Sequence, residues 1–118
     1  MSAARDVRQF VHDMLVNARR AQSIVVGLSS VEALYEVDWR TQYALLRALE
    51  IIGEAARYVP QEVRQLAPEI PWRDVVGMRN LLIHRYHGVD WEIIWETVHG
   101  ALPALMESLE RLLTRLEE

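Results

Sequence analysis

The sequence contains no cysteine, no lysine and only one phenylalanine, and its five glycines and four prolines are few for a chain of 118 residues. The absence of cysteine excludes a disulfide framework, a thiolate metal site and a cysteine nucleophile. The small number of glycines and prolines argues against an all-β domain. No apolar run approaches the roughly 18 residues that a membrane-spanning helix needs. The first residues also lack the apolar core of a signal peptide. We therefore expect a cytoplasmic protein without a membrane association.

Positive charge is also in short supply, because 13 arginines face 17 acidic residues and the formal net charge is −4. A protein of this charge binds nucleic acid only through a local basic patch. The segment 73–87 is one such patch, with three arginines and two histidines against the single acid Asp74. The hydrophobic fraction of 51% is high enough to build a core, which excludes intrinsic disorder. The length fits one domain over residues 1–118.

Apolar residues recur at steps of three and four through most of the chain, which predicts helices. Asp38 and Asp90 are the expected N-caps of two long helices, and Ser29–Glu32 has the form of a capping box before a short one. Pro103 is expected to kink the last helix, because it removes a backbone hydrogen bond to His99. The sequence thus predicts an all-α bundle of four main helices plus short helical turns. The main helices are expected at about 7–25, 38–59, 72–86 and 90–116.

The last of these helices carries a seam of tryptophans and leucines at coiled-coil spacing from Trp91 to Leu116. This seam packs most simply inside its own bundle, where the first helix supplies a matching stripe. Alternatively, Trp91 and Trp95 anchor a subunit interface.

Arg79 is an anomaly in the third main helix. At about 100° per residue, Trp72 and Val76 fall within about 60° of Arg79 on one side, and Val75 and Leu82 fall equally close on the other. A guanidinium on an apolar face must be paired or must line a cleft, since an unpaired buried charge is costly. The simpler, purely structural interpretation is that the Arg79 side chain snorkels to solvent or forms a structural ion pair, with Glu50 and Glu54 as candidate partners. Asn80, His84 and His87 form a polar stripe beside Arg79, and His84 could equally be an ordinary exposed histidine.

The segment from Arg79 to Tyr86 has the form R-x4-H-x-Y, which resembles the signature of the HepT-like toxins of the HEPN superfamily. Three further segments resemble the I-G-E-A-A, I-P-W and G-M-R-N stretches of that family, in the same order: Ile51–Ala56, Ile70–Trp72 and Gly77–Asn80. The resemblance covers most of the chain, from about Asp6 to Leu109.

The resemblance implies a HEPN-like helical bundle that forms a homodimer, with the motif at a cleft between the subunits. It implies a metal-independent endoribonuclease without a cofactor, in which Arg79 and His84 are the active residues and Glu54 and Asn80 support them. It also implies one half of a toxin–antitoxin pair of type VII kind. In that pair a minimal nucleotidyltransferase antitoxin transfers AMP to the motif tyrosine, here Tyr86.

The residue types suit RNA cleavage. His84 can accept or donate a proton near neutral pH, and Arg79 offers a fork of donors that matches phosphate oxygens. The sequence has no convincing triad of metal ligands. Glu54 either orients Arg79 or forms a plain structural ion pair, and Tyr86 either accepts AMP or packs in the cleft wall.

Two further interpretations remain open at this point. Trp39, Tyr43 and Tyr58 could stack on RNA bases, although core packing is the simpler expectation for each. As an alternative function, the chain could be a non-catalytic helical subunit that docks on a nucleotidyltransferase and supplies a substrate site.

Overall fold

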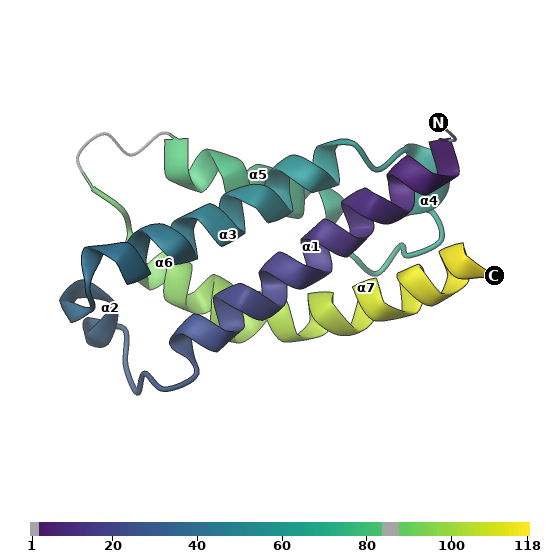
Figure 1. Cartoon of the computed structure of the whole chain (residues 1–118). Helices are drawn as coiled ribbons and strands as arrows, with labels where there is room; N and C mark the ends of the chain where they lie inside the picture. The colour runs from purple at the N-terminus through teal and green to yellow at the C-terminus, as the bar shows by residue number, and fades with distance from the viewer. Residues whose placement is uncertain (1–2, 84–87) are drawn as a thin grey trace.

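A computed structural model describes residues 3–83 and 88–118, and all of its regular elements are helices (Figure 1). No strand occurs in these two ranges, so the predicted all-α fold is confirmed. No helix within them is long and apolar enough to cross a membrane. The elements in chain order are α1 (Ala3–Val25), α2 (Glu32–Glu36), α3 (Trp39–Arg57), α4 (Gln61–Arg64), α5 (Trp72–Ile83), α6 (Trp91–Glu96), η1 (Thr97–Ala101) and α7 (Leu102–Glu117).

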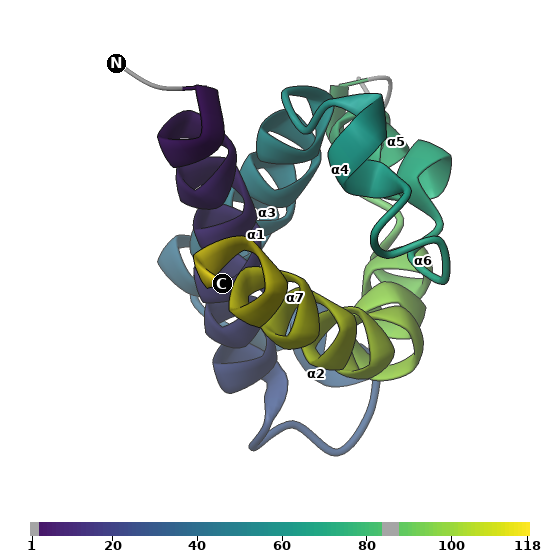
Figure 2. The same cartoon turned by 90° about the vertical axis from the view of Figure 1, so that its right-hand side faces the viewer.

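Four long elements enclose one core. Helix α1 packs against α3 and α7, and α3 also packs against α5. Seen end-on, the helices surround the shared interior (Figure 2). The predicted apolar stripes of α1, α3 and α7 point into that interior. The largest fully buried side chains come from these stripes and from α2 and α6: Met14, Leu34, Leu45, Leu49, Ile52, Ile94, Leu102, Leu109 and Leu112. Trp91 is buried within its own chain, whereas Trp95 is half-buried and stacks on His99.

Two of the three predicted helix caps are present. The carboxylate of Asp38 accepts a hydrogen bond from the Arg40 backbone N–H, and that of Asp90 accepts from two backbone N–H groups of α6. Each carboxylate satisfies donors that have no partner within the helix. The predicted capping box at Ser29–Glu32 is wrong. Helix α2 begins at Glu32 after Val31, and no side chain caps it.

The last helix, where the sequence predicts a kink at Pro103, contains a π-helical turn directly before the α-helical segment that holds the proline. Residues Thr97–Ala101 form a π-helix, and the Leu102 backbone N–H donates to the Thr97 carbonyl, five residues earlier. Pro103 then lies in the first turn of α7, where its missing N–H costs nothing. The extra residue per turn lets the buried faces of α6 and α7 stay on the core despite the proline.

Arg64 ties the end of α3 to the start of α5. Its guanidinium donates to the carbonyls of Ala56 and Val59 at 3.0 and 2.9 Å and lies over the Trp72 ring. The Trp72 indole N–H in turn donates to the Ala67 carbonyl at 3.1 Å. These bonds satisfy a carbonyl in the last turn of α3 and one just after it, and they fix where α5 starts alongside α3.

Candidate functional site

Helices α3 and α5 pack against each other, and Gly53, a buried residue of α3, lies directly against the backbone of α5. A Cβ at this position would lie 2.9 Å from the Arg79 backbone nitrogen and 3.2 Å from the carbonyl oxygens of Val75 and Val76. No side chain fits in that space without moving the backbone of α5. Glycine therefore permits the contact, and the contact places Arg79 beside the residue that follows Gly53, which is Glu54.

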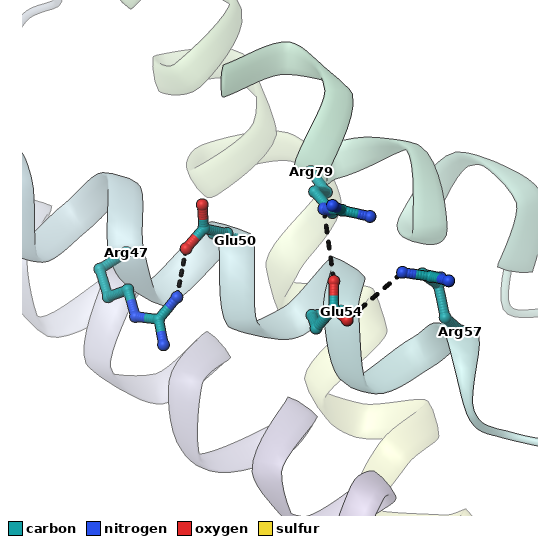
Figure 3. A network of polar contacts seen from close by, with 5 residues as sticks. All are labelled: Arg47, Glu50, Glu54, Arg57 and Arg79. Carbon is teal, nitrogen blue, oxygen red and sulfur yellow. Dashed lines mark hydrogen bonds and ion pairs between the residues drawn. The ribbon is translucent and has the colours of Figure 1, made fainter. Parts of the chain in front are cut away.

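Arg79 and Glu54 form an ion pair across this contact. The Arg79 Nε lies 3.3 Å from Glu54 Oε2, and Arg57 Nη1 lies 3.4 Å from the other carboxylate oxygen (Figure 3). Glu54 is thus held between two arginines, one on its own helix and one on α5. Because Nε makes the contact, the Nη edge of Arg79 can still offer its paired N–H donors to a phosphate.

Arg79 lies at the edge of the apolar face of α5 and not in its middle, which corrects the expectation from the helical wheel. Within residues 72–80, where the structure describes the side chains of α5, Trp72, Val75 and Met78 are buried and Val76 is half-buried. The core-facing arc is therefore centred near Val75. The Arg79 side chain is 40% exposed and Glu54 is 41% exposed, so the pair can be reached from solvent.

The structure separates the two candidate acids. Glu50 pairs with Arg47, which is also on α3, while Glu54 pairs with Arg79 (Figure 3). The sequence could not choose between them, because both carboxylates lie on the same face of α3.

Asn80 is exposed and lies on a different side of α5 from the ion pair. It lines a groove of about 950 Å³ between α5 and the η1–α7 segment, and Arg79 is not part of that lining. The described residues thus bring Arg79 and Glu54 together but leave Asn80 pointing elsewhere. The other predicted site residues, His84 and Tyr86, lie outside the described residues.

Three aromatic side chains overturn the expectation of core packing. Trp39, Tyr43 and Tyr58 are 59%, 65% and 52% exposed. The Trp39 and Tyr43 rings meet edge to face with centroids 5.4 Å apart, and the Arg40 guanidinium lies over the Trp39 ring. Tyr58 stacks on Phe10 instead. Aromatic residues are core formers by type, but these three occupy the solvent face of α3 or follow its end.

Within residues 3–83 and 88–118, no group of three or more histidine and acidic side chains gathers in a way that could hold a metal ion. The chemistry offered by the described part of the site is that of a positioned guanidinium. Such a group binds and neutralises a phosphate, and it needs a partner to move protons.

Comparison with known proteins finds a matching family model and several related sequences. A family model described as "Ribonuclease HepT-like" matches residues 14–112. A candidate RNase of Methanocaldococcus jannaschii is 38% identical over 106 residues, which are 90% of this chain and 95% of that protein. A probable ribonuclease HepT of Thermococcus cleftensis is 49% identical over 75 residues, 64% of this chain and 68% of that protein. A second candidate RNase of M. jannaschii is 33% identical over 97% of both chains. No solved structure matches the chain.

Proposed function

Since this chain belongs to the HepT-like ribonuclease family, we propose that it is an endoribonuclease that cleaves RNA without a metal ion. The observation that carries the proposal is the Arg79–Glu54 pair, which holds a guanidinium at an accessible edge between α3 and α5. Arg79 is also the first residue of the R-x4-H-x-Y segment, so the histidine and the tyrosine follow it closely along the chain.

In the proposed chemistry the ribose 2′-oxygen attacks the adjacent phosphorus, which breaks the bond to the 5′-oxygen and leaves a 2′,3′-cyclic phosphate. His84 takes the proton of the 2′-hydroxyl or returns one to the departing 5′-oxygen, since an imidazole titrates near neutral pH. Arg79 binds the phosphate and neutralises the charge that builds up on its oxygens. Glu54 acts through Arg79 by fixing the direction of the guanidinium.

We further propose that the chain is the toxin of a type VII-like toxin–antitoxin pair in the cytoplasm. In this proposal it works as a homodimer, and a minimal nucleotidyltransferase antitoxin silences it by transferring AMP to Tyr86. A phosphodiester on Tyr86 would bring an anion and a bulky nucleoside close along the chain to Arg79. The anion would compete with the RNA phosphate for the guanidinium.

RNA cleavage tests the catalytic part of this proposal. The purified chain should cut RNA in the presence of EDTA, and His84→Ala should cut it about 10²- to 10⁴-fold more slowly, the range for loss of a general acid–base group. Circular dichroism should give the same helical signal for both proteins. A His84→Ala variant that cuts RNA at the parental rate would show that the histidine is not catalytic. Cleavage that requires added magnesium would contradict the metal-free mechanism.

Intact-mass measurement tests the modification. Incubation with the antitoxin, ATP and magnesium should add the mass of one or more AMP units to the parent chain and none to Tyr86→Phe. The modified chain should no longer cleave RNA. Equal labelling of Tyr86→Phe would place the modification elsewhere, and a labelled chain that still cuts RNA at full rate would separate it from silencing.

A further inference from the structure

The solvent face of α3 carries a row of aromatic and arginine side chains that its own fold does not bury. Trp39 and Tyr43 are more than half exposed, and Arg47 is exposed one turn further along the helix. Large aromatic rings grouped on a surface usually have an external partner, because the chain gains little by leaving them in water.

This row lies on the same side of α3 as Glu54 of the candidate site. At about 100° per residue, Tyr43 and Arg47 lie within about 20° of Glu54, and Trp39 lies within about 60°. Tyr43 precedes Glu54 by eleven residues, which is about 16 Å along the axis at 1.5 Å per residue. A single RNA strand covers that length with roughly three to five nucleotides, since stacked nucleotides rise 3.4 Å each and unstacked ones rise more.

A shallow hollow of about 370 Å³ lies at Tyr43. It is lined by Tyr43, Leu46, Arg47 and Glu50, all of which come from the outer side of α3. The tyrosine ring offers a wall for stacking and the half-buried Leu46 offers an apolar floor. Arg47 and Glu50 pair at the rim, so a donor and an acceptor stand side by side (Figure 3). These are the components with which proteins bind a splayed nucleobase.

We infer that the Tyr43 hollow, with Trp39 beside it, is a subsite for one unpaired base of the RNA whose phosphate binds Arg79. The inference rests on the proposed ribonuclease function and adds to it a preference for single-stranded RNA that extends past the cut site. Stacking carries the binding here. The acids Asp38, Glu50 and Glu54 on this face each pair with an arginine, and long-range attraction of RNA is therefore weak.

A binding cycle between the protein and the RNA tests the inference. The probe is a single strand of about ten nucleotides with 2′-O-methyl riboses, which cannot be cleaved, and its affinity is measured by fluorescence anisotropy. Tyr43→Ala should weaken binding about fivefold or more, the range for loss of one stacked base, and Tyr43→Phe should keep the parental affinity. Moving an abasic nucleotide along the strand should reveal one position that weakens binding by the parent and has no further effect on Tyr43→Ala.

Cleavage of two substrates supplies the second readout. A dinucleotide is too short to reach from Arg79 to Tyr43, so Tyr43→Ala should cut it at the parental rate. The same variant should show a raised KM for the longer strand. If the parent cuts neither substrate, the proposed function fails, while the binding cycle still decides the subsite.

Three outcomes would overturn the subsite. One is parental affinity of Tyr43→Ala for the long strand, and another is equal weakening by Tyr43→Ala at every abasic position. The third is a change of molar mass on Tyr43→Ala in light scattering, which would mean that this face of α3 joins copies of the chain instead of binding a base.

Discussion

Glu54 has two arginine neighbours, Arg57 and Arg79, each beside a different oxygen of its carboxylate and at about the same distance. An ion pair this exposed contributes at most about 1 kcal/mol to folding, because water screens it and the side chains lose freedom. Its larger effect is on phosphate binding by Arg79. A guanidinium that is already held in one orientation loses less conformational entropy when it binds a phosphate.

Glu54→Gln should therefore lower cleavage about tenfold while leaving the free energy of unfolding within about 1 kcal/mol of the parent. The matched control is Glu69→Gln, because Glu69 pairs with Arg111 at 3.4 Å and is 48% exposed but lies away from Arg79. The measurements are RNA cleavage rates at neutral pH and urea unfolding. Equal rates for the two variants would reduce Glu54 to a structural role.

The control is valid at the pH of that assay. A backbone hydrogen bond at Glu69 lowers the pKa of its carboxyl group, burial opposes this, and hydrogen bonds from Ser108 and Arg111 lower the pKa further. A lowered pKa in the folded state means that the pair stabilises the fold above the unfolded pKa, and that this contribution is lost as the pH falls through the folded value. Glu69 is thus ionised and paired at neutral pH.

At the scale of residues, the sequence predicts that Arg79 is either paired or at a cleft, and it offers Glu50 and Glu54 as partners without choosing between them. The choice between Glu50 and Glu54 depends on where α5 crosses α3, and no local pattern contains that information. The error over Trp39, Tyr43 and Tyr58 has a related cause, because residue type alone does not say which face of a helix the neighbours leave open.

Gly53 sets the crossing of α3 and α5. Its position in a stretch with alanines at 55 and 56 lets the two backbones approach, and the closest atom on α5 belongs to the catalytic candidate Arg79. The sequence offered Gly53 only as part of a family resemblance. Its physical role, the space that a Cβ would fill, requires the structure.

Gly53→Ala should destabilise the fold by about 1–3 kcal/mol, because the added Cβ forces the backbone of α5 away from α3. Gly77→Ala is the matched control within α5, where an added Cβ has no atom within 4 Å. It should stabilise the helix by up to about 1 kcal/mol through better helix propensity. Urea unfolding separates the two. A stabilised Gly53→Ala variant would mean that the helices do not meet at this glycine.

N-cap residues and prolines act close to their own position in the chain, so the starts of α3 and α6 were predictable from the sequence, whereas the form of the turn before Pro103 was not. The caps Asp38 and Asp90 each act within three residues of the helix they start, so the sequence contains the whole interaction. That Pro103 disturbs the α-helical pattern of the last helix was predictable for the same reason. Its form was not, because a chain can respond to a missing N–H by a kink or by a π-turn, and packing on the core decides between them.

The whole molecule has a charge distribution that is unusual for a protein proposed to bind RNA. Its formal net charge is −4 and its calculated isoelectric point is about 5.6. Each ion pair of the α3 face joins an arginine to an acid. Such a surface exerts little long-range electrostatic attraction on RNA, so RNA binding depends on a few phosphate contacts and on stacked bases.

The salt dependence of RNA binding should therefore be shallow. Each phosphate contact on a single strand contributes about −0.7 to the slope of the logarithm of the binding constant against the logarithm of salt concentration. If Arg47 and Arg79 are the two arginines that contact phosphates, the slope should be about −1.4. Arg79→Ala should bring the slope to about −0.7. Arg111→Ala, which removes an arginine paired with Glu69 on the far side of the groove, should leave it unchanged. Anisotropy with the uncleavable strand between low and moderate salt gives these slopes.

A parental slope steeper than about −3 would require four or more phosphate contacts. Arg47 and Arg79 alone could not supply them, and RNA binding would then have to extend over a broader basic surface, such as one assembled from two subunits.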